Sequence, residues 1–103
     1  MLLGGMEFVL LGFLFGAAAI ALAIISVVAV MECIFDYWDE IDDEVLIVAP
    51  EASSELAKIA REKGSKQHKR FAYNPATKDA VLLESDSISD ELRGEDVVTV
   101  AIS

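Results

Sequence analysis

The sequence predicts one N-terminal transmembrane helix followed by a small α+β domain. Three observations support this class: residues 8–31 form one uncharged apolar stretch, residues 32–43 are rich in acidic and aromatic side chains, and residues 44–103 contain short β-type runs around an amphipathic helical pattern. The whole chain is 54% hydrophobic and carries a net charge of −10. We therefore divide it into a leader with its span (1–31), a juxtamembrane collar (32–43) and a soluble domain (44–103).

The stretch 8–31 predicts a transmembrane helix because it has no charged residue, and only two glycines and one serine fall outside the hydrophobic class. A helix of this length rises roughly 36 Å, which exceeds a bilayer hydrocarbon core of roughly 30 Å. A cleaved signal peptide is disfavoured, since the leader has no Lys or Arg and the apolar run is longer than usual for such peptides. We expect a single-pass protein of the cell membrane.

Small side chains recur within this stretch at alternating steps of four and three residues, so they would share one face of the helix. They are Gly12, Gly16, Ala19, Ala23 and Ser26. Small residues let a second backbone approach closely, which favours helix association in lipid. The seam predicts packing against a second copy or another membrane protein, although glycine and alanine are also simply common in membrane helices.

The collar predicts the exit of the chain from the membrane. Phe35, Tyr37 and Trp38 are aromatic residues of the kind that gathers at the lipid headgroup level. Acids are frequent from Glu32 to Glu44, but the segment lacks the glycine and ligand spacing of a calcium loop, so we expect a solvated collar and no metal. The lone thiol of Cys33 suits a reducing compartment, which places the following domain on the cytoplasmic side.

The domain 44–103 predicts four strands and two helices. In order, they are a strand at 45–49, a helix from Pro50 to the stop at Gly64, a hairpin of strands 68–73 and 79–84, a short helix at 87–94 and a strand at 96–102. The order β-α-β-β-α-β resembles the ferredoxin-like split βαβ arrangement. That resemblance implies a two-layer sandwich, with a four-stranded sheet and both helices on one face. A looser α+β domain is the alternative.

Basic residues concentrate in one part of this domain. Residues 56–78 contain seven bases and one acid, whereas the chain as a whole is strongly acidic. The candidate patch for an anionic ligand or a lipid headgroup consists of Lys58, Arg61, Lys66, Lys69 and Arg70. A solvated surface or a protein-docking surface are the alternatives. We expect no nucleic-acid partner, because the field of the whole chain is repulsive.

No catalytic motif is present. The sequence lacks G-x-S-x-G, H-E-x-x-H, C-x-x-C and a glycine-rich phosphate loop, and it has one His and one Cys. We therefore expect no enzyme, no catalytic residues, no cofactor and no metal. The predicted function is a non-catalytic accessory or structural subunit that packs through its helix among membrane lipids and docks a partner through its soluble domain. The alternative is a membrane-tethered sensor or binding module for an anionic ligand or lipid headgroup.

Overall fold

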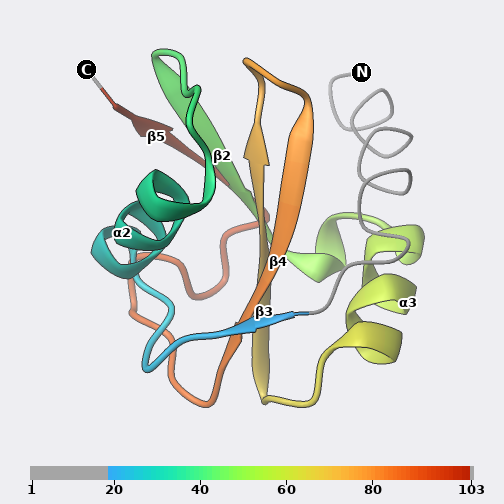
Figure 1. Cartoon of the computed structure of the whole chain (residues 1–103). Helices are drawn as coiled ribbons and strands as arrows, with labels where there is room; N and C mark the ends of the chain where they lie inside the picture. Colours follow the sequence, from blue (N-terminus) through green and yellow to red (C-terminus); the bar gives the residue numbers. More distant parts are fainter. Residues whose placement is uncertain (1–18, 103) are drawn as a thin grey trace.

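Residues 19–102 are described by a computed structural model, and they form an α+β domain in which a five-stranded mixed sheet carries two α-helices (Figure 1). In chain order the elements are β1 (Ile20–Ala21), α2 (Val27–Tyr37), β2 (Glu44–Val48), the 3₁₀ helix η1 (Pro50–Ala52), α3 (Ser54–Lys63), β3 (His68–Asn74), β4 (Asp79–Ser85) and β5 (Val97–Ala101). Of the fold class predicted from the sequence, the structure confirms the α+β domain.

The strands lie in the order β1-β4-β3-β2-β5. All neighbours are antiparallel except β1 and β4, which run parallel with Ile20 opposite Leu83. β2 lies between β3 and β5 and is buried from Val45 to Val48, as its continuous β-branched and apolar sequence predicts for a strand covered on both faces. The expected hairpin is present as β3 and β4, with Asn74 opposite Asp79 at its turn.

The two helices cover opposite faces of the sheet, and Figure 1 shows the sheet between them. Side chains alternate along β2, so Val45 and Ile47 pack in the core on the α2 side, whereas Leu46 and Val48 pack on the α3 side. The α2-side core is Ile25, Val30, Ile34, Trp38, Val45, Ile47, Ala72, Val81, Leu83, Ile88, Leu92 and Val100. The α3-side core is Leu46, Val48, Leu56, Ile59, Ala60, Phe71, Ala80 and Leu82.

Both helices begin at a serine that caps their free N–H groups. The Ser26 hydroxyl accepts a hydrogen bond from Ala29 N at 3.1 Å, and the Ser53 hydroxyl accepts one from Leu56 N at the same distance. α3 ends before Gly64, as the sequence predicts. Each helix is therefore fixed at its start by a local side-chain contact and along its length by its core-facing residues.

The expected continuous helix over 8–31 is wrong for the part that the structure describes. Residues 20–21 form β1, Ile25 makes a parallel bridge with Ile88, and α2 begins only at Val27. Ile25 is 0% exposed and lies in the α2-side core. The physical reason is that an apolar sequence indicates that its side chains avoid water, but does not indicate whether lipid or a protein core surrounds them, since both remove apolar side chains from water.

The search for membrane-spanning helices covered residues 19–102 and found none of sufficient length and apolarity. Gly12 and Gly16 lie outside the described residues, as does the larger part of the expected span. Ala19, Ala23 and Ser26 are described, but none lies within a helix: Ala19 precedes β1, Ala23 lies in a bend and Ser26 is the cap of α2. These three residues therefore do not form one helical face.

The ferredoxin-like arrangement is also wrong. α3 connects β2 to its antiparallel neighbour β3, whereas a split βαβ unit requires its helix to connect two parallel strands. The helices lie on opposite faces, and residues 87–94 form turns in place of a second helix. That segment is too short for a stable helix, and it instead inserts Ile88 and Leu92 into the α2-side core.

Candidate anion-binding pocket

A pocket opens at the edge of the sheet where β2 ends. β2 pairs with β3 only through Phe71, Ala72 and Tyr73, so residues 68–70 of β3 extend beyond it without a strand partner on that side among the described residues. Pro50 follows β2 and cannot donate a further backbone hydrogen bond, which is consistent with the end of pairing here. The chain then turns through η1 into α3 and leaves a wedge between these elements and β3.

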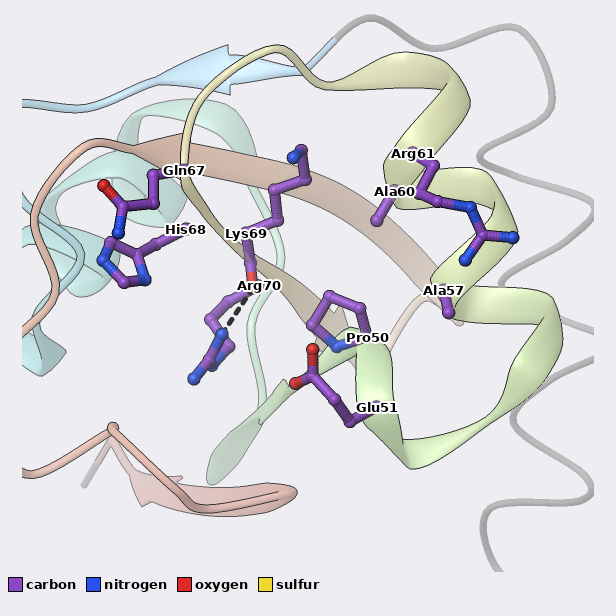
Figure 2. Close-up of a pocket in the computed structure, with 9 residues that line it drawn as sticks. All are labelled: Pro50, Glu51, Ala57, Ala60, Arg61, Gln67, His68, Lys69 and Arg70. Atoms are coloured by element: carbon purple, nitrogen blue, oxygen red, sulfur yellow. Dashed lines mark hydrogen bonds between the residues drawn. The ribbon is translucent and has the colours of Figure 1, made fainter.

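This wedge is a cavity of about 350 Å³ (Figure 2). Its lining residues come from η1, α3 and the start of β3: Pro50, Glu51, Ala57, Ala60, Arg61, Gln67, His68, Lys69 and Arg70. Three of them are basic and one is acidic, so the lining carries an excess of positive charge in a chain whose net charge is −10. Figure 2 shows Arg61 on α3 and Lys69 and Arg70 on the neighbouring β3, with the guanidinium of Arg70 directed away from α3.

Arg70 is the buried cation of this pocket. Arg70 is only 9% exposed. Its guanidinium donates hydrogen bonds to Lys69 O at 2.7 Å and to Leu92 O at 3.3 Å. Burial lowers the pKa of Arg70, while the carboxylates of Glu51 and Asp96 act in the opposite direction. Arginine remains protonated in proteins, so the pocket retains a positive charge held by two neutral carbonyls.

Within the described part of the chain, no carboxylate lies at ion-pair distance from the Arg70 guanidinium. A buried arginine has five N–H donors, and the two carbonyls use only part of this capacity. Such a group favours an oxyanion, because the planar guanidinium matches the geometry of carboxylate and phosphate. The arrangement can therefore bind an anion.

The other two cations differ in how firmly they are held. The Lys69 ammonium donates to Lys66 O at 2.7 Å, and the Lys69 side chain lies over Gly64, where an added Cβ would clash with it. Arg61 is exposed and lies in the last turn of α3. The pocket thus combines a buried guanidinium, an oriented ammonium and an exposed guanidinium.

The structure brings together three members of the patch predicted from sequence. Arg61, Lys69 and Arg70 line the pocket, whereas Lys58 is exposed on α3 outside it and Lys66 forms an ion pair with Asp86 at 3.7 Å. The lining residues that sequence analysis missed are Pro50, Glu51, Ala57, Ala60, Gln67 and His68. The one available signal was the proline directly after a buried strand, which marks the end of pairing.

The predicted membrane-interface aromatics separate in the structure. Phe35 and Tyr37 are half-exposed, at 52% and 50%. Trp38 is buried, and its indole N–H donates to the Asp79 carboxylate at 2.7 Å, so its expected position at the lipid headgroups is corrected to one in the protein core. The edge of the Tyr37 ring packs against Trp38, with ring centroids 5.7 Å apart.

Among residues 19–102, no group of three or more His, Cys, Asp and Glu side chains is arranged to hold a metal ion. The pocket lining has no cysteine, serine or threonine nucleophile beside His68. Comparison with family models, curated proteins and solved structures gave no match to this chain.

Proposed function

We propose that this protein is a small, non-catalytic binding module, tethered to the cell membrane, that recognises an anionic group in the basic pocket. The observation that supports this most strongly is Arg70, a buried cation in the pocket lining that has no carboxylate at ion-pair distance among the described residues and on which Glu51 and Asp96 act only at longer range. A buried charge is costly unless it is paired, and an anionic ligand would supply the missing partner.

The cavity volume favours a small anion. About 350 Å³ lies at the lower end of the range of small-molecule sites, roughly 300–1,000 Å³. Phosphate and carboxylate groups share the oxyanion chemistry that arginine recognises, and either a lipid headgroup or a free anion presents it. The open side of the pocket beside Arg61 would accommodate the rest of such a ligand.

We further propose that the membrane tether lies in the apolar sequence before the described domain, and that the domain is on the cytoplasmic side. Residues 20–26 belong to the sheet and to the approach to α2, so the apolar sequence left for a tether is 8–18, less than half of the stretch first considered. A run of this length is too short to cross a hydrocarbon core of roughly 30 Å as a helix, so the tether we propose is an uncharged interfacial or re-entrant segment. Flotation of the full chain with phosphatidylcholine vesicles tests the attachment, and a Leu11→Lys/Leu14→Lys variant should float less.

Isothermal titration of the full chain with inorganic phosphate tests the pocket. Arg70→Gln and Arg61→Gln should each weaken binding by about tenfold, whereas Lys58→Gln should change it less than twofold. Lys58→Gln is the matched control, because it removes the same charge from an exposed site outside the pocket. Arg61→Gln guards against a folding defect of the buried Arg70 variant, since Arg61 is exposed.

Vesicles separate the two sources of the anion. Stronger binding to vesicles that contain phosphatidylglycerol, lost in Arg61→Gln, would identify a headgroup, and phosphate binding that vesicles do not affect would identify a free anion. Equal losses in Arg61→Gln and Lys58→Gln would mean that only bulk charge matters, which contradicts the proposal. No binding of either probe at millimolar concentration would refute it.

A second candidate function is an accessory or structural subunit that docks a partner protein. The observation in its favour is a group of exposed apolar side chains around α2, namely Ile24, Val28, Phe35 and Tyr37. Exposed apolar patches frequently mark protein interaction sites. Crosslinking of the full chain in its native membrane tests this function, and a chain that yields only monomer would contradict it.

A further inference from the structure

A groove runs along the outer side of α2, on the sheet face opposite α3 and therefore away from the basic pocket. Its volume is about 600 Å³. The lining residues are Leu22, Ala23, Ile24, Ala29, Glu32, Cys33, Asp36 and Tyr37. No basic side chain lines it, so its chemistry is apolar and acidic.

One wall of the groove is a line of residues along α2. Ala29, Cys33 and Tyr37 are four residues apart, so they follow one another along one side of the helix. The other wall is the segment 22–24, which is fixed at both ends: Leu22 N donates to Glu84 O at 2.8 Å, and Ile25 N donates to Ser87 O at 2.9 Å. The groove is therefore formed before any partner arrives.

The rim of the groove is apolar as well as acidic. Ile24 is 40% exposed and lines the groove. Val28, which is 67% exposed, and Phe35, two helical turns after it, lie on the neighbouring side of α2, beyond Glu32. Glu32 and Asp36 also line the groove, and each directly precedes another lining residue, Cys33 or Tyr37. Two exposed carboxylates thus lie between the apolar lining of the groove and the exposed side chains of Val28 and Phe35.

The groove has a negative field. Burial and the nearby Asp36 carboxylate raise the pKa of the Cys33 thiol. Beyond the end of α2 the exposed acids of the collar continue the same charge, among them Asp39, Glu40 and Asp42. With a net charge of −10, the protein also attracts cations over a longer range.

We propose that this groove binds an amphipathic helix of a partner protein whose apolar face is flanked by Lys or Arg side chains. A preformed apolar groove on a helix pair or helix-loop surface is a recurring site for such a helix, and the acids of its rim select basic flanks. This inference specifies the kind of partner that an accessory subunit would dock. It rests on the accessory-subunit function and not on the anion pocket.

Two other occupants fit the groove less well. The chain's own apolar sequence before the described domain has no Lys or Arg, since the first base of the chain is Lys58. A second copy would have to offer an apolar surface. Of the large exposed hydrophobic residues of the described part, Ile24 and Tyr37 line this acidic groove, and Val28 and Phe35 lie on the side of α2 next to Glu32 and Asp36. Pairing two such surfaces would set like charges against each other, which is destabilising.

The test uses the full chain and an 18-residue amphipathic peptide of leucine and lysine, with a leucine–glutamate peptide of the same pattern as control. Cys33 is the only cysteine of the chain and lines the groove, so its rate of alkylation reports directly on occupancy. The leucine–lysine peptide should slow Cys33 alkylation severalfold, and the leucine–glutamate peptide should leave it unchanged. Equal protection by both peptides, or by neither, would overturn the proposal.

Charge reversal on the rim supplies the matched variants. Glu32→Lys/Asp36→Lys should weaken binding of the leucine–lysine peptide by about tenfold. Glu62→Lys/Glu95→Lys makes the same change in net charge at exposed positions outside the groove, and should weaken it less than threefold. Equal losses in the two double variants would reduce the effect to bulk charge and refute a specific groove.

A photoreactive maleimide attached to Cys33 identifies the natural occupant in native membranes. Crosslinks to a basic amphipathic segment of another protein support the proposal. Crosslinks to residues 8–18 of the same chain, to a second copy or to lipid would overturn it. A partner that is crosslinked only through surfaces away from α2 would also overturn it, while leaving the accessory-subunit function intact.

Discussion

Replacing Ile25 with alanine tests whether this apolar residue is buried in the core of the domain or in membrane lipid. Ile25 is 0% exposed, in the core between α2 and the segment around Ile88. Its neighbour Ile24 has the same side chain and is the preceding residue of the apolar stretch, yet Ile24 is 40% exposed and lines the groove beside α2. The pair therefore supplies its own matched control.

The expected loss follows from the groups that each change removes. Isoleucine to alanine deletes three carbon atoms, worth about 2.4 kcal/mol at about 0.8 kcal/mol each, and the cavity left in a core adds to this. We expect Ile25→Ala to lower the free energy of unfolding by about 3 kcal/mol. For Ile24→Ala we expect about 1 kcal/mol, since nearly half of that side chain already contacts water.

Urea unfolding followed by the fluorescence of Trp38 measures both losses. Trp38 is the only tryptophan and is buried in the same core as Ile25, so its emission reports on this core. With a slope of about 1–2 kcal/mol per M, the Ile25 variant should unfold at least about 1 M urea earlier than the Ile24 variant. Equal midpoints for the two variants would refute the burial of Ile25 in the domain and would favour a lipid environment for both residues.

Three further predictions concern single contacts. Ser53→Ala removes the N-cap of α3 and should lower the free energy of unfolding by about 1 kcal/mol in thermal melts, with Ser53→Thr restoring most of it. Glu84→Gln weakens a buried acceptor of two backbone N–H groups in the loop 65–66, and should cost about 1–3 kcal/mol in urea unfolding. Asp36→Asn should lower the pKa of Cys33, so the pH profile of alkylation should move to lower pH; an unchanged profile would contradict the role of that carboxylate. Because folding raises the thiol pKa, the protonated thiol favours the fold, and this contribution is lost as the pH rises through the thiol range.

Local patterns predicted the strands and the first helix after residue 44, but not the turns that replace the expected helix at 87–94. The β-branched run of β2, the serine-capped and glycine-ended α3 and the proline-containing hairpin turn are determined by neighbouring residues, so sequence alone was sufficient. The pairing partners were not predictable in the same way. β1 covers only Ile20–Ala21, and its place beside β4 depends on contacts with residues more than 60 positions away. A pattern that is uniformly apolar carries no period, and therefore contained no sign that a strand and a helix divide it.

The candidate pocket depends on the same kind of distant contact. Arg70 falls in a run of basic residues, and nothing in that run distinguishes it from Lys58, which is exposed to solvent. What distinguishes Arg70 is that β2 ends at Val48, two residues before Pro50, and that the chain after α3 continues into β3, the strand beside β2. These two features leave the start of β3 uncovered at its edge and bring Leu92 close enough to accept a hydrogen bond from the guanidinium. The charge pattern of the sequence therefore predicted a basic surface. Only the topology of the sheet shows that Arg70 is the buried cation on which the proposed anion binding depends.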